Sequence, residues 1–138
     1  MRLLLLLLFV GLPCLSLADS TASRFANKIE KCSVGSLSES SACLDNLYTQ
    51  RNKQMNVLYQ ALLSSLELPA PLKDAQTTWL KFRAQTCEYE TSGIDKVGGL
   101  FYYMQSKCLL VATDKRIAEI NQYLACKTSP CPGRTSKN

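Results

Sequence analysis

The 138-residue chain contains no histidine. Its absence excludes Ser-His-Asp and Cys-His catalysis, histidine zinc sites and an imidazole pH switch near neutrality. The excess of basic charge is also small, a net +5, whereas nucleic-acid binders concentrate more positive charge in one patch. With 46% hydrophobic and 20% charged residues, the composition is that of one small globular domain, and we predict no nucleic-acid partner.

A long apolar run is also missing outside the first residues of the chain. After Arg2, the apolar stretch Leu3 to Leu12 is much shorter than the roughly 20 residues that a membrane-spanning helix needs. Ser16-Leu17-Ala18 then offers small residues at the −3 and −1 positions of a signal-peptidase site. We therefore predict a signal peptide at residues 1–18, cut after Ala18, and a periplasmic or secreted mature chain without a transmembrane segment.

Cleavage would leave an even number of cysteines. Cys14 departs with the signal peptide; its lipidation is disfavoured, because Pro13 replaces the small residue of lipoprotein signals. Six cysteines in an exported chain predict three disulfides. Zinc is a weak alternative because no CxxC motif occurs, so we predict no metal and no cofactor. Among the possible connectivities we favour the local pairs Cys32–Cys43, Cys87–Cys108 and Cys126–Cys131.

Apolar residues recur at helical spacing along the mature chain. A short first helix would bury Phe25, Ile29 and Cys32, and Ser36 with Glu39 matches a capping box, although Ser38 and Ser40 are equally good caps. A second helix is predicted over about 41–66, with the row Leu44, Leu47, Tyr48, Met55, Leu58, Tyr59, Leu62 and Leu66. A third follows Pro69 and Pro71, with Leu72, Ala75, Trp79, Phe82, Thr86 and Tyr89 inward. A fourth covers about 99–125, with Leu100, Met104, Cys108, Val111, Ile117, Ile120 and Leu124 inward.

These patterns predict one all-α domain at residues 19–126, an antiparallel bundle of three to four helices with three disulfides. Residues 127–138 would form a polar C-terminal tail held at Cys131. Ser92-Gly93 and Gly98-Gly99 bracket the break between the last two helices.

Three ordered motifs lie within this domain. The first is Cys43-Leu44 with Tyr48, Asn52, Met55-Asn56, Tyr59 and Leu62; the second is Ala75-Gln76-x2-Trp79-x2-Phe82-Arg83-x3-Cys87; the third is Gly98-Gly99, Cys108 and Thr113-x2-Arg116-x2-Glu119-Ile120. Together they resemble the LprI-type lysozyme-inhibitor family over about residues 32–124. The resemblance implies an exported helical bundle of the bacterial envelope, whose founding example inhibits lysozyme. Asn52 and Ala84 stand where the family usually has acids.

The motif residues have simple structural interpretations. Trp79 and Phe82 would lie in the core, with Arg83 at its rim beside a carboxylate such as that of Glu119. Asn56 and Tyr59 would form buried hydrogen bonds between helices. Thr113, Arg116 and Glu119 would contact neighbouring helices through side-chain hydrogen bonds and an ion pair.

The corner after the third helix carries acids without bases. Between Ala84 and Asp95 the only charged residues are Glu88, Glu90 and Asp95, and carboxylates at the C-terminal end of a helix oppose its macrodipole. Tyr89, Tyr102 and Tyr103 are close in sequence, and tyrosine is common in interfaces. The corner is thus a candidate contact surface for a cationic partner, such as a lysozyme cleft, with a plain solvated turn as the alternative.

We therefore predict a binding protein, not an enzyme, that occludes a lysozyme or related cell-wall hydrolase. An immunity or envelope protein that binds another periplasmic toxin would have the same fold and a similar surface. Catalysis by the acids Glu88 and Glu90 is disfavoured because their i, i+2 spacing places them on different faces of a helix.

Overall fold

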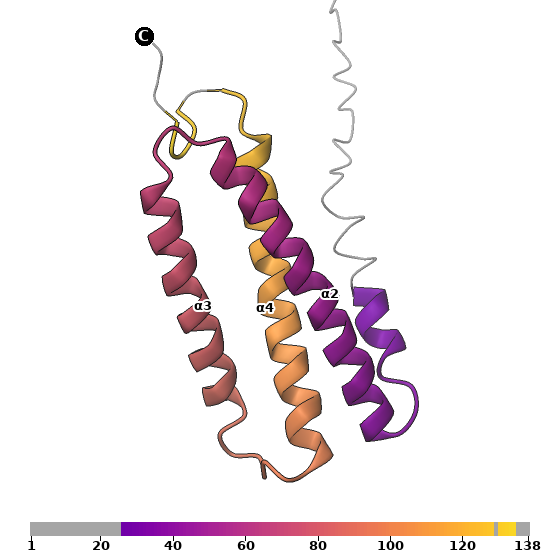
Figure 1. Cartoon of the computed structure of the whole chain (residues 1–138). Helices are drawn as coiled ribbons and strands as arrows, with labels where there is room; N and C mark the ends of the chain where they lie inside the picture. Colours follow the sequence, from indigo (N-terminus) through magenta and orange to yellow (C-terminus); the bar gives the residue numbers. More distant parts are fainter. Residues whose placement is uncertain (1–25, 129, 135–138) are drawn as a thin grey trace, which may run out of the picture.

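The computed structural model describes residues 26–128 and 130–134. After a short helical segment at residues 26–31, the chain forms α2 (Leu37–Ser64), α3 (Ala70–Glu90) and α4 (Gly99–Ala125). Each long helix runs antiparallel to the preceding one (Figure 1). The described residues contain no strand, and the predicted all-α bundle is confirmed. The predicted signal peptide at residues 1–18 lies outside the described residues.

The start of α2 is fixed by its capping box. The Ser36 hydroxyl accepts a hydrogen bond from the Glu39 backbone N–H (3.3 Å), and the Glu39 carboxylate accepts one from the Ser36 backbone N–H (2.8 Å). These bonds satisfy backbone donors that the first helical turn leaves without partners. Of the three possible caps, the chain uses Ser36, so α2 begins at Leu37, earlier than the predicted start near Ser41.

The helix ends follow proline and glycine. Pro69 caps α3 and Pro71 lies in its first turn, where a missing N–H leaves no hydrogen bond unmade. Gly98 caps α4. The break predicted between the two glycine pairs is confirmed, because α3 ends at Glu90 and α4 begins at Gly99.

Two apolar clusters hold α2 and α4 together, and these two helices approach each other far more closely than either approaches α3 (Figure 1). The first cluster is formed by Met55, Leu62, Ile117 and Ile120, with Trp79 among the half-buried residues packed on it. The second, toward the start of both helices, is formed by Cys32, Leu44 and Leu110. The predicted apolar row of α2 is confirmed, since its members are buried or half-buried.

All three predicted disulfide pairings are confirmed. Cys32–Cys43 joins the 26–31 segment to α2, Cys87–Cys108 joins α3 to α4, and Cys126–Cys131 closes a loop after α4. A disulfide typically contributes about 2–4 kcal/mol to the stability of a small domain. The backbone of α3 approaches that of α4 closely at few positions. The Cys87–Cys108 bridge links these two helices covalently.

The segment after the last disulfide is fastened to the connection between α2 and α3. The Leu68 backbone N–H donates to the Gly133 carbonyl (3.2 Å), and Arg134 Nη1 donates to the Cys126 carbonyl (2.8 Å). Gly133 has a φ of 69°, and a Cβ there would lie 3.1 Å from a methyl carbon of Leu66, so a side chain at this position would meet both strain and crowding.

The predicted inward faces of α3 and α4 need correction. Phe82 and Tyr89, predicted inward, are 63% and 80% exposed, and Ala75 is exposed too. On α4, Leu100 and Met104 are 48% and 37% exposed. The fully inward positions of α3 are instead Gln76, Arg83 and Cys87. Leu72 and Trp79 of the predicted row pack half-buried on the first apolar cluster. Two of the three buried residues are polar, however, so apolar spacing misplaced the rest of the row.

The capping box makes the stability of the bundle sensitive to acid. Hydrogen bonds from Ser36 hold the pKa of the Glu39 carboxyl below its ordinary value. A lowered carboxyl pKa stabilises the fold above the unfolded-state value of about 4.3, and this contribution is lost as the pH falls through the folded-state pKa. We expect Ser36→Ala to lower the free energy of unfolding at pH 7 by about 0.5–2 kcal/mol, and to reduce its decline between pH 5 and pH 3. Urea unfolding at pH 7, pH 5 and pH 3 measures both effects, with Ser38→Ala, inside the helix, as the control. Equal pH dependence of wild type and S36A would contradict the prediction.

Candidate functional site

A belt of polar residues separates the two apolar clusters. Arg51 of α2 forms an ion pair with Asp114 of α4, and burial lowers the pKa of Arg51. On the α3 side, Arg83 donates through Nη1 to the Asn52 Oδ1 atom (3.0 Å) and to the Thr113 Oγ1 atom (2.7 Å). The belt therefore links all three long helices through side-chain hydrogen bonds.

Arg83 is buried, contrary to its predicted place at the rim. Its exposed fraction is 9%, and its Nε atom is buried without a hydrogen-bond partner in the part of the chain that the structure describes. The predicted pairing with Glu119 is wrong, because the Glu119 carboxylate accepts instead from Arg116 (2.8 Å). Arg83 thus brings a positive charge inward with neutral hydrogen-bond partners.

Aromatic rings flank the Arg83 guanidinium. Its Cζ atom lies 5.5 Å from the ring centre of Tyr48 and 5.0 Å from that of Trp79, and the Cζ atom of Arg116 lies 5.5 Å from the same Trp79 ring. Each contact is within the range of a cation–π interaction, worth about 0.5–2 kcal/mol depending on desolvation. Trp79, half-buried as a core residue, therefore also contacts two arginines.

Arg116 is the second buried arginine, and it is better paired. Its Nε donates to Gln76 Oε1 on α3 (2.9 Å), and its Nη1 bonds Glu119 one turn away on α4. Gln76 in turn contacts the Met55 sulfur of α2 (3.8 Å). The predicted interhelical hydrogen bonds of Thr113 and Arg116 are confirmed, whereas the ion pair of Glu119 is formed with Arg116 within α4.

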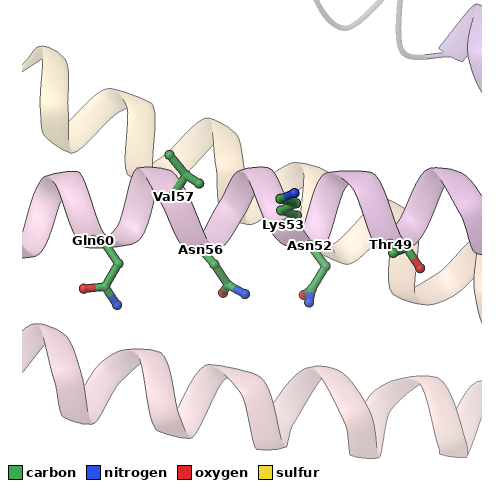
Figure 2. A pocket seen from close by; sticks show the side chains of 6 residues that line it. All are labelled: Thr49, Asn52, Lys53, Asn56, Val57 and Gln60. Carbon is green, nitrogen blue, oxygen red and sulfur yellow. The ribbon is translucent and has the colours of Figure 1, made fainter.

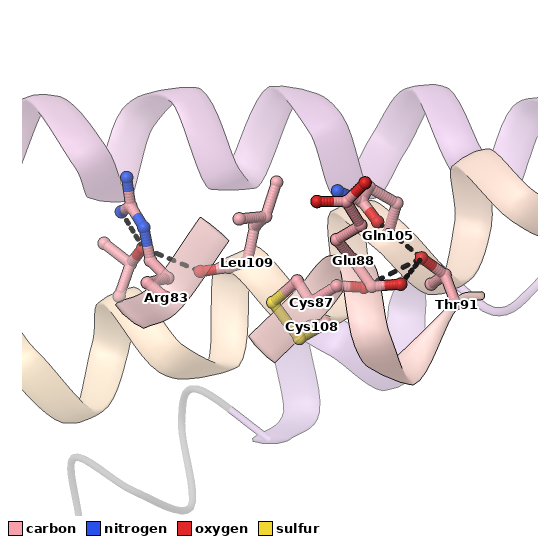
Figure 3. Close-up of a disulfide and its surroundings, with 8 residues drawn as sticks. Arg83, Cys87, Glu88, Thr91, Gln105, Cys108 and Leu109 are labelled. Carbon is pink, nitrogen blue, oxygen red and sulfur yellow. Dashed lines mark hydrogen bonds between the residues drawn. A yellow bond between two sulfur atoms is a disulfide. The ribbon is translucent and has the colours of Figure 1, made fainter. Parts of the chain in front are cut away.

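A pocket of about 400 Å³ opens beside Arg83. Figure 3 shows Arg83 at one end and Glu88 at the other, with Leu109 between them and the Cys87–Cys108 disulfide below. Near Glu88, the hydroxyl of buried Thr91 bonds the Gln105 side chain (2.9 Å). The pocket is lined by Tyr48, Arg83, Ala84, Glu88, Lys96, Phe101, Gln105 and Leu109.

A second, shallower hollow of about 550 Å³ follows α2. Asn52, Asn56 and Gln60 recur every four residues and point toward α3 (Figure 2). Asn56 is exposed and its side chain makes no hydrogen bond within the described chain, so its predicted buried interhelical bond is wrong. Tyr59 instead packs half-buried on the first apolar cluster. The hollow is lined by Thr49, Asn52, Lys53, Asn56, Val57 and Gln60.

The predicted contact corner lies at the α3–α4 end of the bundle, opposite the C-terminal segment (Figure 1). Its acids Glu88, Glu90 and Asp95 are exposed, and Tyr89 and Tyr102 are 80% and 57% exposed.

One predicted member of the corner is directed elsewhere. Tyr103 is half-buried in the second apolar cluster, and its hydroxyl lies 3.4 Å from that of Ser33. Exposed apolar residues also lie near this end and were not predicted there: Val97 is 89% exposed and Leu100 48%. Leu37, 44% exposed, abuts Gly99 from α2, so the apolar surface extends from one helix to the next.

Two further properties concern the described residues only. Within 26–128 and 130–134, no group of three or more Cys, Asp or Glu side chains is arranged to hold a metal ion. No helix in these ranges has the length and apolar character needed to cross a membrane.

The model of one protein family, described as lysozyme inhibitor LprI, matches residues 31–120. The chain belongs to the LprI lysozyme-inhibitor family. The LprI match includes all of α2 and α3 and most of α4, and with them both buried arginines, Arg83 of α3 and Arg116 of α4. No curated protein and no solved structure matches the chain.

The polar belt predicts a specific cost for removing one hydroxyl. Thr113 is fully buried and accepts from Arg83, so Thr113→Val, which keeps the shape, leaves a buried charged donor short of a partner. We expect a loss of about 1–3 kcal/mol in the free energy of unfolding. Urea unfolding measures it, with Thr77→Val as the control, because Thr77 is exposed and bonds only its own helix at Lys73. Equal stabilities of the two variants would contradict the role of the belt.

Proposed function

We propose that this protein is an exported inhibitor that binds a lysozyme or a related cell-wall hydrolase and occludes its substrate cleft. The observation that carries the proposal is the LprI family match over residues 31–120. Three disulfides support export, because such bonds form and persist outside the cytoplasm.

The α3–α4 corner is the surface that we assign to the hydrolase. Exposed tyrosines such as Tyr89 supply large contact area at low entropic cost, and exposed Val97 and Leu100 add apolar area around them. Glu88, Glu90 and Asp95 give this end acidic groups that suit a cationic cleft. A corner between two helices also projects from the bundle, which is the shape needed to enter a concave site.

Charge complementarity would act at short range. The chain is basic overall, and many lysozymes are cationic too, so the net charges oppose the encounter. Screening at physiological ionic strength limits this repulsion to about 8 Å. The local acids of the corner, which lie nearer to the partner in the complex, would then decide the contact.

Occlusion rather than catalysis fits the placement of the acids. Glycosidases hold two carboxyl groups about 5–9 Å apart in one cleft. Glu88 lines the pocket beside Arg83 and Glu90 does not, so the two acids do not share this pocket. The inhibitor needs only a complementary surface, which an exposed corner provides.

A lysis assay with a panel of lysozymes tests the proposal. Purified, oxidised protein should protect bacterial cell walls in a dose-dependent way against at least one lysozyme of the panel. No protection against any of them would contradict inhibition and favour the alternative of an immunity or envelope protein with another target. Peptidoglycan turnover by the protein alone, abolished by Glu88→Gln, would contradict a purely binding role.

The corner itself is tested by removing its acids. The triple variant Glu88→Ser, Glu90→Ser, Asp95→Ser should weaken inhibition by about threefold to a hundredfold, since each exposed charge contributes about 0.2–1 kcal/mol.

The matched control for the corner makes the same change in net charge elsewhere. It replaces three other exposed acids with serine, and it should inhibit like wild type, with urea unfolding of both variants checking the fold. Equal inhibition by the two triple variants would remove the corner from the interface. The three control positions are Glu30, Asp45 and Asp74.

A further inference from the structure

Arg83 holds a buried positive charge that the chain does not neutralise. Its two hydrogen bonds, both from Nη1, go to the neutral side chains of Asn52 and Thr113. In the described part of the chain no carboxylate bonds or ion-pairs with it, and its Nε has no partner. Taking an ion out of water is costly unless it is paired and fully hydrogen-bonded, so neutral dipoles and ring faces offset only part of the cost.

Arg116 shows what a satisfied buried arginine looks like in the same bundle. It is buried to the same degree, at 7% exposure. Its nitrogens reach both the amide oxygen of Gln76 and the carboxylate of Glu119. The difference is that the Arg116 guanidinium bonds the carboxylate of Glu119, whereas the Arg83 side chain lines an open pocket.

The pocket beside Arg83 has the form of a ligand site. Its volume of about 400 Å³ is within the range of small-molecule sites. Tyr48, Phe101 and Leu109 give it apolar walls, and Lys96 adds a second cation to its lining. The single acid in the lining, Glu88, lies at the end away from Arg83 (Figure 3).

Two nearby residues do not neutralise the charge of Arg83. Asn52 contributes a neutral amide, and Ala84 lines the pocket without any polar group. An acid in place of Asn52 would put a carboxylate within hydrogen-bond distance of Arg83 Nη1. Asn52 is neutral and no described carboxylate pairs with Arg83, so any counter-charge would have to come from outside the described chain.

We propose that this pocket binds a carboxylate group carried on an apolar body, with the carboxylate paired to Arg83. The Nη2 atom of Arg83 makes no hydrogen bond within the described residues, so a carboxylate in the pocket can accept from it, and the apolar body packs on the rings and on Leu109. Glu88 disfavours a doubly charged anion such as phosphate. A free carboxylic acid and an acidic side chain of a partner protein share this chemistry. The site does not depend on lysozyme inhibition.

The only tryptophan of the chain provides the readout, because the Trp79 ring lies 5.0 Å from Arg83 Cζ. We titrate the protein with cyclohexanecarboxylate at constant ionic strength and follow Trp79 fluorescence and the Nε–H NMR signal of Arg83. Both signals should change saturably. The uncharged cyclohexanecarboxamide should change neither.

A pair of isosteric variants separates the site from general charge effects. Asn52→Asp places an internal carboxylate beside Arg83. It should weaken the binding of cyclohexanecarboxylate by about tenfold or more, since charge-assisted hydrogen bonds are strong. Asn56→Asp adds the same charge one turn away on α2, at an exposed position that does not contact Arg83, and should leave probe affinity unchanged. Both changes conserve size, and the circular dichroism spectra of the variants confirm their fold.

Three results would overturn the proposal: no saturable signal, equal probe affinity in N52D and N56D, or tighter binding of inorganic phosphate than of the probe. When the probe binds as expected, the same two variants identify the source of the carboxylate. If N52D loses lysozyme inhibition and N56D keeps it, the carboxylate belongs to an acidic side chain of the partner protein. If both variants inhibit like wild type, the carboxylate belongs to a free acid. If no lysozyme is inhibited at all, the probe titration still shows whether the pocket binds a carboxylate.

Discussion

The burial of Arg83 between two apolar clusters is the constraint on which the arrangement of α3 depends. A guanidinium at that depth needs acceptors from both other long helices, and Asn52 and Thr113 provide them. Trp79 and Tyr48 cover its faces. Because large polar and aromatic side chains fill this layer, α3 stands farther from its neighbours than α2 and α4 stand from each other. The pocket beside Arg83 is a consequence of that spacing.

Much of the fold could be predicted from the sequence, because it rests on local signals. The capping box, the prolines before α3 and the glycines before α4 each act within a few residues. The disulfide pairing was predictable for the same reason, since each bridge joins two cysteines that are consecutive in the sequence. The apolar row of α2 was also readable, because α2 packs by apolar contact along its length.

The candidate site was less predictable, and α3 shows why. Its inward row contains Gln76 and Arg83, so apolar periodicity selected Phe82 and missed the true face. Arg83 was expected at the rim because charged residues are rarely buried. A signal was present in the motif itself, because Asn52 stands where the family resemblance implies an acid. Only the fold shows that Asn52 bonds Arg83, so the link between this neutral residue and a buried charge could not be predicted.

The fastening of residues 131–134 to the α2–α3 connection has a practical consequence. Hydrogen bonds through Gly133 and Arg134, together with the Cys126–Cys131 bridge, anchor this segment at the end of the bundle away from the α3–α4 corner. A reporter or surface tether fused after this anchor would start from a fixed point and leave the opposite tip free to meet a large enzyme. Attachment through this end of the bundle therefore suits binding measurements on an immobilised protein.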